Sequence, residues 1–526
     1  MKRKSPITRY ASIFLLLLLL LPSCTDEFSA LNTPNNEIVA DQVDAGLLGQ
    51  AFAQSQFVGM YGSPGPFQIT QALFADLYAQ YFATTAENFD SDQFVEVGRW
   101  IDSAWNNFYA TAAPQIHFVV QFSEEQGLDL QNAVAKVWKV QLFHRITDYW
   151  GPIIYSEFGN GATSVAYDPQ DEIYRSFFTT LDEAVAVLQQ NSGGNAFATN
   201  DQLYEGNVDQ WRTFANSLRL RLAMRVKYVD PALAREEAEK AVSAGVMQSN
   251  ADNAEVLTTA NSRNPYTTIT DWGEFRMSSA MESLLEGYED PRLGVYFSPA
   301  VDGDTDADGR PYEGMRNGLP RVEKGPVLNP KYSDMGADWL NDNRGGSNPP
   351  IKVMSASEVY FLRAEGALEG WDMGGSVEQL YNEGIRMSLS EDRIGALGAE
   401  IDAYVSSSNQ PIAPEDEWSS PPMTDIPVAF DAGGSQERQL EQIITQKWLA
   451  LYPDSWEAYS EHRRTGYPRL YPIINSANPD IPPNGVFRRM TFVDSEFSNN
   501  RAAVEAAVSL LPGPDRNDTR VWWDAR

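Results

Sequence analysis

The sequence predicts a mainly α-helical protein in which pairs of helices form a scaffold and long irregular loops build a ligand-binding face. Three observations predict this fold class. Apolar side chains recur at helical spacing in several segments. The helical segments recur in pairs. Between them lie stretches rich in Gly, Pro, Asn and aromatic residues, which are long enough to be functional, chiefly 249–278, 298–350 and 404–436.

The segment 209–247 shows the helical pattern best. In DQWRTFANSLRLRLAMRVKYVDP the apolar residues fall on one helix face: Trp211, Phe214, Ala215, Leu218, Leu222 and Val226. Asp230 and Pro231 end this helix, and ALAREEAEKAVSAGVM begins a second helix almost at once. We expect the two helices to pack as an antiparallel pair.

Three further pairs are predicted from segments that each have an apolar face. They are 133–149 with 171–189, 357–369 with 376–389, and 438–452 with 455–463. Helix pairs of about 34 residues are the unit of tetratricopeptide-type solenoids. Because the chain contains no clean consensus repeat, we predict a tetratricopeptide-like scaffold rather than a strict repeat array.

The N-terminus has the features of an export signal. Strictly apolar residues extend from Ile13 to Leu21, which is too short for a membrane-spanning helix of about 20 residues. A basic segment precedes this run and contains Lys2, Arg3, Lys4 and Arg9. We therefore predict a signal peptide at 1–23 that is removed from the mature protein.

Cys24 is the only cysteine of the chain, so it has no partner for a disulfide. A catalytic thiolate needs an activating base and a folded pocket, which an exposed terminus lacks. Residues 21–24 (LPSC) resemble a bacterial lipobox, in which the cysteine is acylated and becomes the mature N-terminus. Several acyl chains hold such a terminus on a membrane. Cys24 is therefore the predicted lipidation site.

This interpretation divides the chain into a signal peptide at 1–23, a lipidated tether at 24–46 and a binding domain at 47–526. Asp26 and Glu27 resemble the acidic signal that directs some lipoproteins to the outer face of the outer membrane. The mature chain holds 36 basic and 72 acidic residues, a formal net charge of −36. Such a charge repels phosphate backbones, which argues against a nucleic-acid partner.

Catalytic chemistry is poorly supported by the sequence. The three histidines have no companions at zinc-ligand spacing and are predicted to be structural: His117, His144 and His462. No phosphate-binding GxxxxGK(S/T) loop is present. A carboxylate pair for glycoside hydrolysis is not readable from sequence, because the required separation is spatial.

The acidic segment DGDTDADGRPYEG (302–314) suggests calcium, because alternating acids let several oxygens converge on one ion. The candidate ligands are Asp302, Asp304, Asp306, Asp308 and Glu313. Neither of two EF-hand-like registers is complete. The alternative interpretation is a solvated acidic loop.

Aromatic residues on the long loops are the candidate ligand contacts, since a ring offers an apolar face while nearby polar groups give direction. The segment NPYTTITDWGEFRMS supplies five of them: Tyr266, Asp271, Trp272, Phe275 and Arg276. Tyr312 and Trp339 on the next loop complete the set. Large aromatics are more often core residues than ligand contacts, and that alternative stays open for each.

Seven segments together resemble the SusD/RagB family of outer-membrane lipoproteins, particularly its second SusD-like branch. They are RITDYWGPIIYSE, WRTFANSLRLRLAMR, YEDPRL, SEVYFLRAEGALEGW, QKWLALY, RRTGYPRL and TRVWWD. One local departure is the run 151–155 (GPIIY), where the family commonly has a Gly-Asp-Ile-Pro-Tyr-like run.

The resemblance implies a helical fold with a scaffold of tetratricopeptide-like pairs. It also implies a non-enzymatic surface protein that binds an oligosaccharide and delivers it to a SusC-like TonB-dependent channel. Three alternatives remain: a peptide-binding lipoprotein, a surface glycoside hydrolase, and a structural lid with little ligand affinity. The resemblance transfers no ligand-residue motif.

Several residues of these segments have packing explanations. Four tryptophans are predicted to lock helices and the C-terminus: Trp448, Trp456, Trp522 and Trp523. Arg463 and Arg464 are predicted to satisfy buried carboxylates or helix-end carbonyls.

Overall fold

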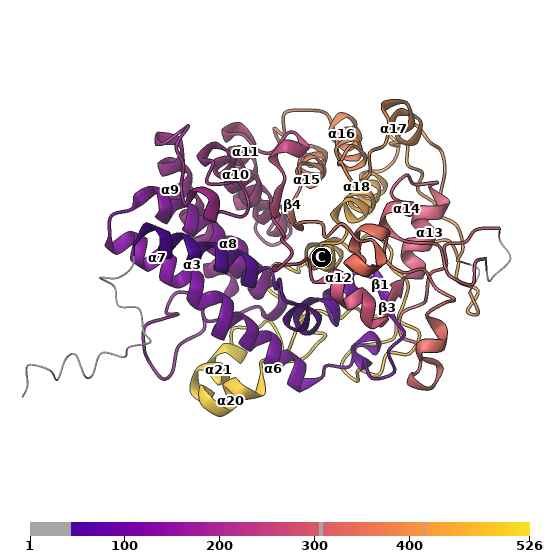
Figure 1. The fold of residues 1–526 in the computed structure, drawn as a ribbon, viewed down its shortest axis with the longest axis horizontal. Helices are drawn as coiled ribbons and strands as arrows, with labels where there is room; N and C mark the ends of the chain where they lie inside the picture. The colour runs from indigo at the N-terminus through magenta and orange to yellow at the C-terminus, as the bar shows by residue number, and fades with distance from the viewer. Residues whose placement is uncertain (1–43, 305–308, 415) are drawn as a thin grey trace, which may run out of the picture. The chain divides into compact units, whose positions relative to one another are not determined.

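The structure is a computed structural model that describes residues 44–304, 309–414 and 416–526 (Figure 1). The chain divides into two compact units, 1–48 and 49–526, and the second contains the helical scaffold and the loops described below. Cys24, the predicted signal peptide and nearly all of the predicted tether lie outside the described residues. The three-part division of the chain therefore stays a prediction.

The second unit is mainly helical, as predicted. Helix α3 (Ala45–Gly59) begins before residue 49 and ends in the second unit. The other helices in the first half of the second unit are α4 (Pro64–Phe67), α5 (Ala75–Tyr78), α6 (Gly98–Asn106), α7 (Ala113–Glu125), α8 (Asp129–Trp150), α9 (Gln170–Gln190), α10 (Val208–Arg225) and α11 (Pro231–Ala244). In its second half they are α12 (Tyr266–Ile269), α13 (Ser279–Gly287), α14 (Leu293–Tyr296), α15 (Ala356–Leu368), α16 (Val377–Leu389), α17 (Gly398–Val405), α18 (Gln436–Leu451), α19 (Ser455–Thr465), α20 (Asp494–Asn499) and α21 (Arg501–Val508).

The predicted helix pairs are confirmed and stack against one another (Figure 1). α8 packs on α9, α10 on α11, and α15 on α16. α10 also contacts α9 and α15, and α15 contacts α18, so the pairs form one continuous scaffold. Within the described residues, no helix combines the length and the apolar character needed to cross a membrane.

Side-chain caps explain where several scaffold helices begin. Asn207 accepts hydrogen bonds from the first-turn amides of α10, and Asp230 accepts one from Leu233 at the start of α11. Ser376 forms a capping box with Gln379 at the start of α16. These caps satisfy N–H groups that have no partner within the helix.

Two short antiparallel strand pairs tie the long loops to the scaffold. β1 (Phe82–Thr84) pairs with β3 (Phe275–Met277), and β2 (Ala254–Val256) pairs with β4 (Ile351–Met354). The predicted irregular loop at 249–278 thus contains two strands and the short helix α12. Its ends are held in place, although most of its length is not helical.

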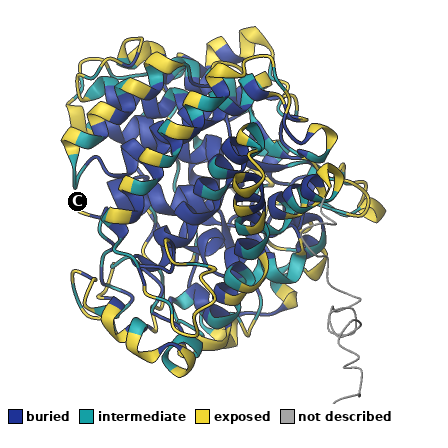
Figure 2. Ribbon diagram, turned by 90° about the vertical axis from the view of Figure 1, so that its left-hand side faces the viewer, coloured by how far each residue is buried: buried dark blue, intermediate teal, exposed yellow. Residues whose placement is uncertain are grey.

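Buried ion pairs join the scaffold helices through α10. Figure 2 shows the buried segments in dark blue inside the helical scaffold, with the exposed segments toward its outside. Arg221 is paired with Glu358 of α15, with N–O distances of 2.7 and 2.6 Å. Arg225 contacts Glu457 and Glu461 of α19 at 2.5 and 3.0 Å. All of these side chains are almost completely buried. One face of α10 thus carries two arginines whose charges are neutralised by carboxylates on α15 and α19.

The same network continues on the C-terminal side of α19. Arg464 forms a two-pronged pair with Glu365 of α15 at 2.7 and 2.6 Å, and Lys227 lies 2.9 Å from the same carboxylate. Burial alone would raise the pKa of Glu365, but Arg464 and Lys227 hold it at about 2. The Nη1 of Arg463 donates to the backbone oxygens of Asp148 and Arg488, both at 2.7 Å. These contacts confirm the roles predicted for Arg463 and Arg464.

We predict that Arg221→Met destabilises the protein strongly, because Glu358 would remain buried without its partner. The expected loss in the free energy of unfolding is about 3–5 kcal/mol, measured by urea denaturation. The control is Arg235→Met, which breaks the exposed 2.9 Å pair with Glu239 on α11 and should cost less than about 1 kcal/mol. Equal losses in the two variants would contradict this account of the network.

Candidate functional site

The segment 264–278 carries most of the predicted ligand contacts and is anchored by the β1–β3 pair. In this pair Arg276 lies opposite Ala83, and Phe275 lies opposite Thr84. The short turn Thr270–Trp272 precedes β3. Trp272 is 44% exposed at the end of this turn, although its neighbours in β3 are buried. A large indole ring is therefore held at the surface by a fixed backbone.

Gly273 is needed to present Trp272 in this way. Its φ of +67° is in the left-handed region that favours glycine. A Cβ at this position would lie 2.9 Å from the side-chain nitrogen of Asn329. The hydroxyl of Thr85 lies 3.2 Å from the Gly273 oxygen and 2.7 Å from the Asn329 side-chain oxygen. The turn is thus pinned to two other loops.

A chain of alternating charges runs from the core to this surface. Arg276 is 7% exposed and lies 3.8 Å from Asp334, which Arg344 contacts at 2.8 Å. Arg344 then lies 3.5 Å from the exposed Asp271, the residue before Trp272. Burial lowers the pKa of Arg276. The structure therefore brings Asp271, Trp272 and Arg276 together through two residues that the sequence did not single out.

Three other candidates are covered by neighbouring side chains. Tyr266 is 4% exposed, Phe275 is 8% exposed and Trp339 is 2% exposed. The Trp339 ring packs beneath the guanidinium of Arg393, at 5.5 Å from its centroid. In this conformation their faces are not available for stacking. A role as ligand contacts would require this loop region to open, so it stays a prediction.

Tyr266 rests on a buried carboxylate. Its hydroxyl lies 3.1 Å from each oxygen of Asp76, and the hydroxyl of Ser455 and the amide of Gln71 also donate to Asp76. Burial raises the pKa of Asp76 to about 7, although these donors favour the ionised form. Asp76 therefore titrates near neutral pH beneath the loop that carries the candidate contacts.

The remaining predicted residues lie on the loop 298–350. Tyr312 is half-buried, with its hydroxyl next to Gly294 of α14. Asp306 and Asp308 lie outside the described residues. Asp302 and Asp304 are exposed, and Glu313 is buried. In the part of the chain that is described, no three metal-ligating side chains gather closely enough to hold an ion. Calcium therefore stays a prediction.

Two of the three histidines are structural, as predicted. The Nδ1 atoms of His144 and His462 lie 3.3 and 3.1 Å from the backbone oxygens of Val140 and Pro468. Burial lowers the pKa of His462 to about 4 and that of His144 well below its ordinary value. Both rings are therefore neutral near pH 7. His117 is less buried, and its pKa is lowered by burial and by Lys139.

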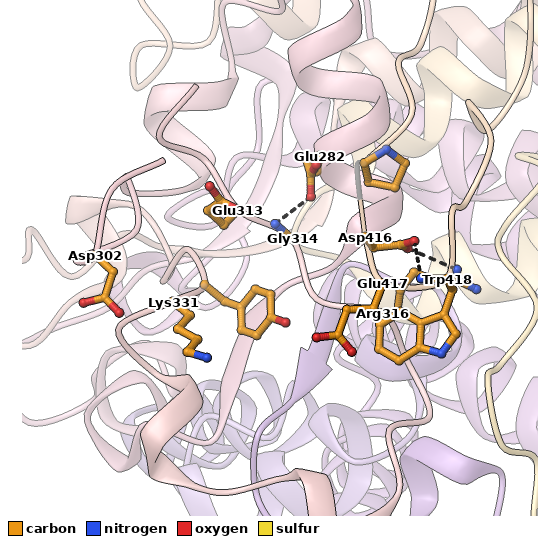
Figure 3. Close-up of a pocket in the computed structure, with 11 residues that line it drawn as sticks. Glu282, Asp302, Glu313, Gly314, Arg316, Lys331, Asp416, Glu417 and Trp418 are labelled. Atoms are coloured by element: carbon orange, nitrogen blue, oxygen red, sulfur yellow. Dashed lines mark hydrogen bonds and ion pairs between the residues drawn. The ribbon is translucent and has the colours of Figure 1, made fainter. Parts of the chain in front are cut away.

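An acidic cleft of about 350 Å³ lies between the loops 298–350 and 404–436 (Figure 3). Its carboxylates come from α13 and from both loops: Glu282, Asp302, Glu313, Asp416 and Glu417. Arg316 and Lys331 are the two basic residues that line it. Asp302 and Glu313 were predicted from the sequence as calcium ligands. That they meet Glu282, Asp416 and Glu417 was not indicated, because these residues are far apart along the chain.

Two aromatic side chains also line the acidic cleft. Tyr332 is half-buried and Trp418 is 38% exposed. Asp416 shapes the loop that presents Trp418, because its Oδ1 accepts N–H bonds from Trp418 and Ser420, both at 3.0 Å. Burial and the nearby carboxylates, first that of Glu417, raise the pKa of Tyr332 to about 12. The Tyr332 hydroxyl therefore stays protonated.

The chain matches one known protein family over most of its length. A family model for the SusD and RagB outer-membrane lipoproteins matches residues 30–524. No curated protein gives a significant match.

Solved structures are similar over nearly their full length. A chitin-binding SusD homologue from Flavobacterium johnsoniae is 36% identical, with a TM-score of 0.83, over 91% of this chain and 98% of that chain. A SusD homologue from Bacteroides thetaiotaomicron is 32% identical, with a TM-score of 0.81, over 91% and 99%. One from Bacteroides ovatus is 31% identical, with a TM-score of 0.82, over 91% and 99%.

We predict that Asp76→Asn changes how stability depends on pH. The pKa of Asp76 is about 7 in the folded protein against an ordinary value of 3.8. The stability that this group contributes is therefore full below about pH 4 and is lost as the pH rises through about 7. An amide does not ionise, so the free energy of unfolding of Asp76→Asn should rise relative to the parent over this range.

Urea denaturation at several pH values between about 4 and 8 measures this difference. The exposed Asp372→Asn is the control and should follow the parent at every pH. If the free energy of unfolding depended on pH in the same way for Asp76→Asn and the parent, protonation of Asp76 would make no contribution to stability.

Proposed function

The chain belongs to the SusD/RagB family of outer-membrane lipoproteins, and we propose that it is a glycan-binding protein displayed on the cell surface. One observation carries the proposal. The chitin-binding homologue from Flavobacterium johnsoniae is 36% identical, and the match covers 98% of that protein. An oligosaccharide built from amino sugars, as chitin is, is the ligand class that this similarity supports.

The surface around Trp272 is the proposed contact for such a ligand. An exposed indole offers an apolar face to the C–H groups of a sugar ring. Because the ring is exposed, a ligand can cover it without displacing side chains that pack on it. Asp271 and Arg344 lie beside Trp272 and supply acceptor and donor groups for hydroxyls. The turn is held by Gly273 and the β1–β3 pair, so the contact surface is preformed.

Binding in this proposal involves no covalent step. The family is one of outer-membrane lipoproteins, and the homologue from Flavobacterium johnsoniae is a chitin-binding protein. The two buried histidines are neutral structural groups. The resemblance to the family further implies delivery of the captured oligosaccharide to a SusC-like TonB-dependent channel. Acylation of Cys24 would keep the protein beside that channel on the outer membrane.

We predict that Trp272→Ala weakens oligosaccharide binding about tenfold, or about 1.4 kcal/mol, because the stacking face is lost. Isothermal titration calorimetry with chito-oligosaccharides, chosen after a glycan and peptide array, measures the effect. Phe118→Ala is the matched control, since Phe118 is 39% exposed on α7 and should leave the affinity unchanged. Equal affinities of parent and Trp272→Ala would place the site elsewhere, and binding of peptides alone would reject the glycan proposal.

We predict that Cys24→Ser releases the protein from the membrane without unfolding it, because the anchor is a lipid rather than a transmembrane segment. Fractionation of cells that express the variant measures the release, and circular dichroism of the soluble protein checks the fold. If Cys24→Ser remained with the membrane after a salt wash, the lipobox interpretation would be wrong.

A further inference from the structure

The acidic cleft and the surface around Trp272 are formed by different structural elements, carry different charges and contain different aromatic side chains. It is lined by α13, by Asp302 and the 313–332 part of one loop, and by Pro414 and residues 416–418 of the other. Five carboxylates and two basic side chains line it, a formal excess of three negative charges. Figure 3 shows Glu282 and Glu313 on one side, with Asp416, Glu417 and Trp418 on another.

The two basic residues of the lining differ in how they are held. Arg316 is already engaged, because its Nη1 lies 3.3 Å from Asp416 and its Nη2 donates to the backbone oxygen of Pro472 at 2.9 Å. Lys331 is exposed at the rim. The Nε of the buried Arg316 side chain has no hydrogen-bond partner among the described residues. That N–H is left for an acceptor such as a sugar hydroxyl, whereas the exposed Glu417 carboxylate in the same lining supplies an acceptor for a cationic group.

The rings distinguish an organic cation from a metal ion. Calcium needs six to eight oxygens at about 2.3–2.6 Å, and the described residues contain no such convergence of metal-ligating side chains. Trp418 and Tyr332 instead offer π faces, which attract an ammonium group while they cover the C–H groups attached to it. Carboxylates at the same opening supply charge-assisted acceptors for its N–H groups.

We infer that the acidic cleft binds an amino-sugar unit with a free ammonium group, as in a deacetylated chito-oligosaccharide. This inference rests on the proposed function and specifies its ligand class. An acetylated unit carries no positive charge, so it would lose the attraction of the carboxylates. Anionic glycans would be repelled both by this cleft and by the net charge of the mature chain.

Replacing Trp418 or Glu417 tests the inferred binding of an ammonium group most directly. Both side chains are exposed and adjacent, so their replacement leaves the core intact. The protein is titrated with acetylated and deacetylated chito-oligosaccharides of equal length by isothermal titration calorimetry. Near pH 6 we expect the deacetylated ligand to bind about fivefold more tightly. That preference should disappear near pH 9, since such an amine has a pKa of about 8.

Glu417→Gln and Trp418→Ala should each weaken binding of the deacetylated ligand about fivefold and leave binding of the acetylated ligand within about twofold. Glu378→Gln, which replaces an exposed carboxylate on α16, is the matched control and should change neither affinity. Circular dichroism of each variant confirms that it is folded.

Three outcomes would overturn the inference. The first is equal binding of the acetylated and deacetylated ligands at both pH values, which would leave the proposed glycan function standing. The second is binding of the deacetylated ligand by the two cleft variants as tightly as by the parent. The third is displacement of that ligand by calcium from the parent but not from Glu417→Gln, which would assign the cleft to a metal. Binding of neither oligosaccharide would instead count against the proposed function itself.

Discussion

The scaffold depends on neutralising the arginines that α10 buries. Arg221 and Arg225 have no access to water, and their partners come from α15 and α19. Burying an unpaired charge costs several kcal/mol, whereas a complete pair roughly balances its own desolvation. The network therefore adds little stability over an apolar core, but it penalises every arrangement in which one of these helices is displaced. It selects one relative placement of the helix pairs.

A scaffold with one permitted arrangement can carry surface groups in fixed positions. The β1–β3 pair extends this rigidity into the loops, and Gly273 turns the chain so that Trp272 faces solvent. Asp416 does the same for Trp418 with hydrogen bonds to the loop backbone. Two exposed indoles are thus held on preorganised backbones, which lowers the entropy lost when a ligand binds. Both lie on loops, where binding residues of rigid folds are commonly found.

Much of the fold was predictable, but the site was predictable only in part. Helix positions were predicted from the spacing of apolar residues. The roles of Arg463 and Arg464 were predicted because these two charged residues belong to a segment that also contains an aromatic residue. The apolar face of α10 was also correct, yet the arginines on its other faces are buried as well, because neighbouring helices cover it all round. Trp272, Tyr266 and Trp339 were equivalent candidates by type and spacing. Their exposures of 44%, 4% and 2% separate them. Of the residues that line the acidic cleft, Asp302 and Glu313 had been predicted, as calcium ligands, and the others had not.

The sequence alone was sufficient for the helix pairs, the acidic charge and the resemblance to the family, and it also predicts the export and lipidation signals. Each of these depends on residues that are neighbours along the chain or on composition, so local spacing is sufficient to read them. Only the tertiary structure decided which aromatic rings face solvent and which carboxylates meet. Those properties depend on segments that are distant in sequence, as when Glu282, Tyr332 and Trp418 line one cleft. Burial is a property of the assembled fold rather than of any segment within it.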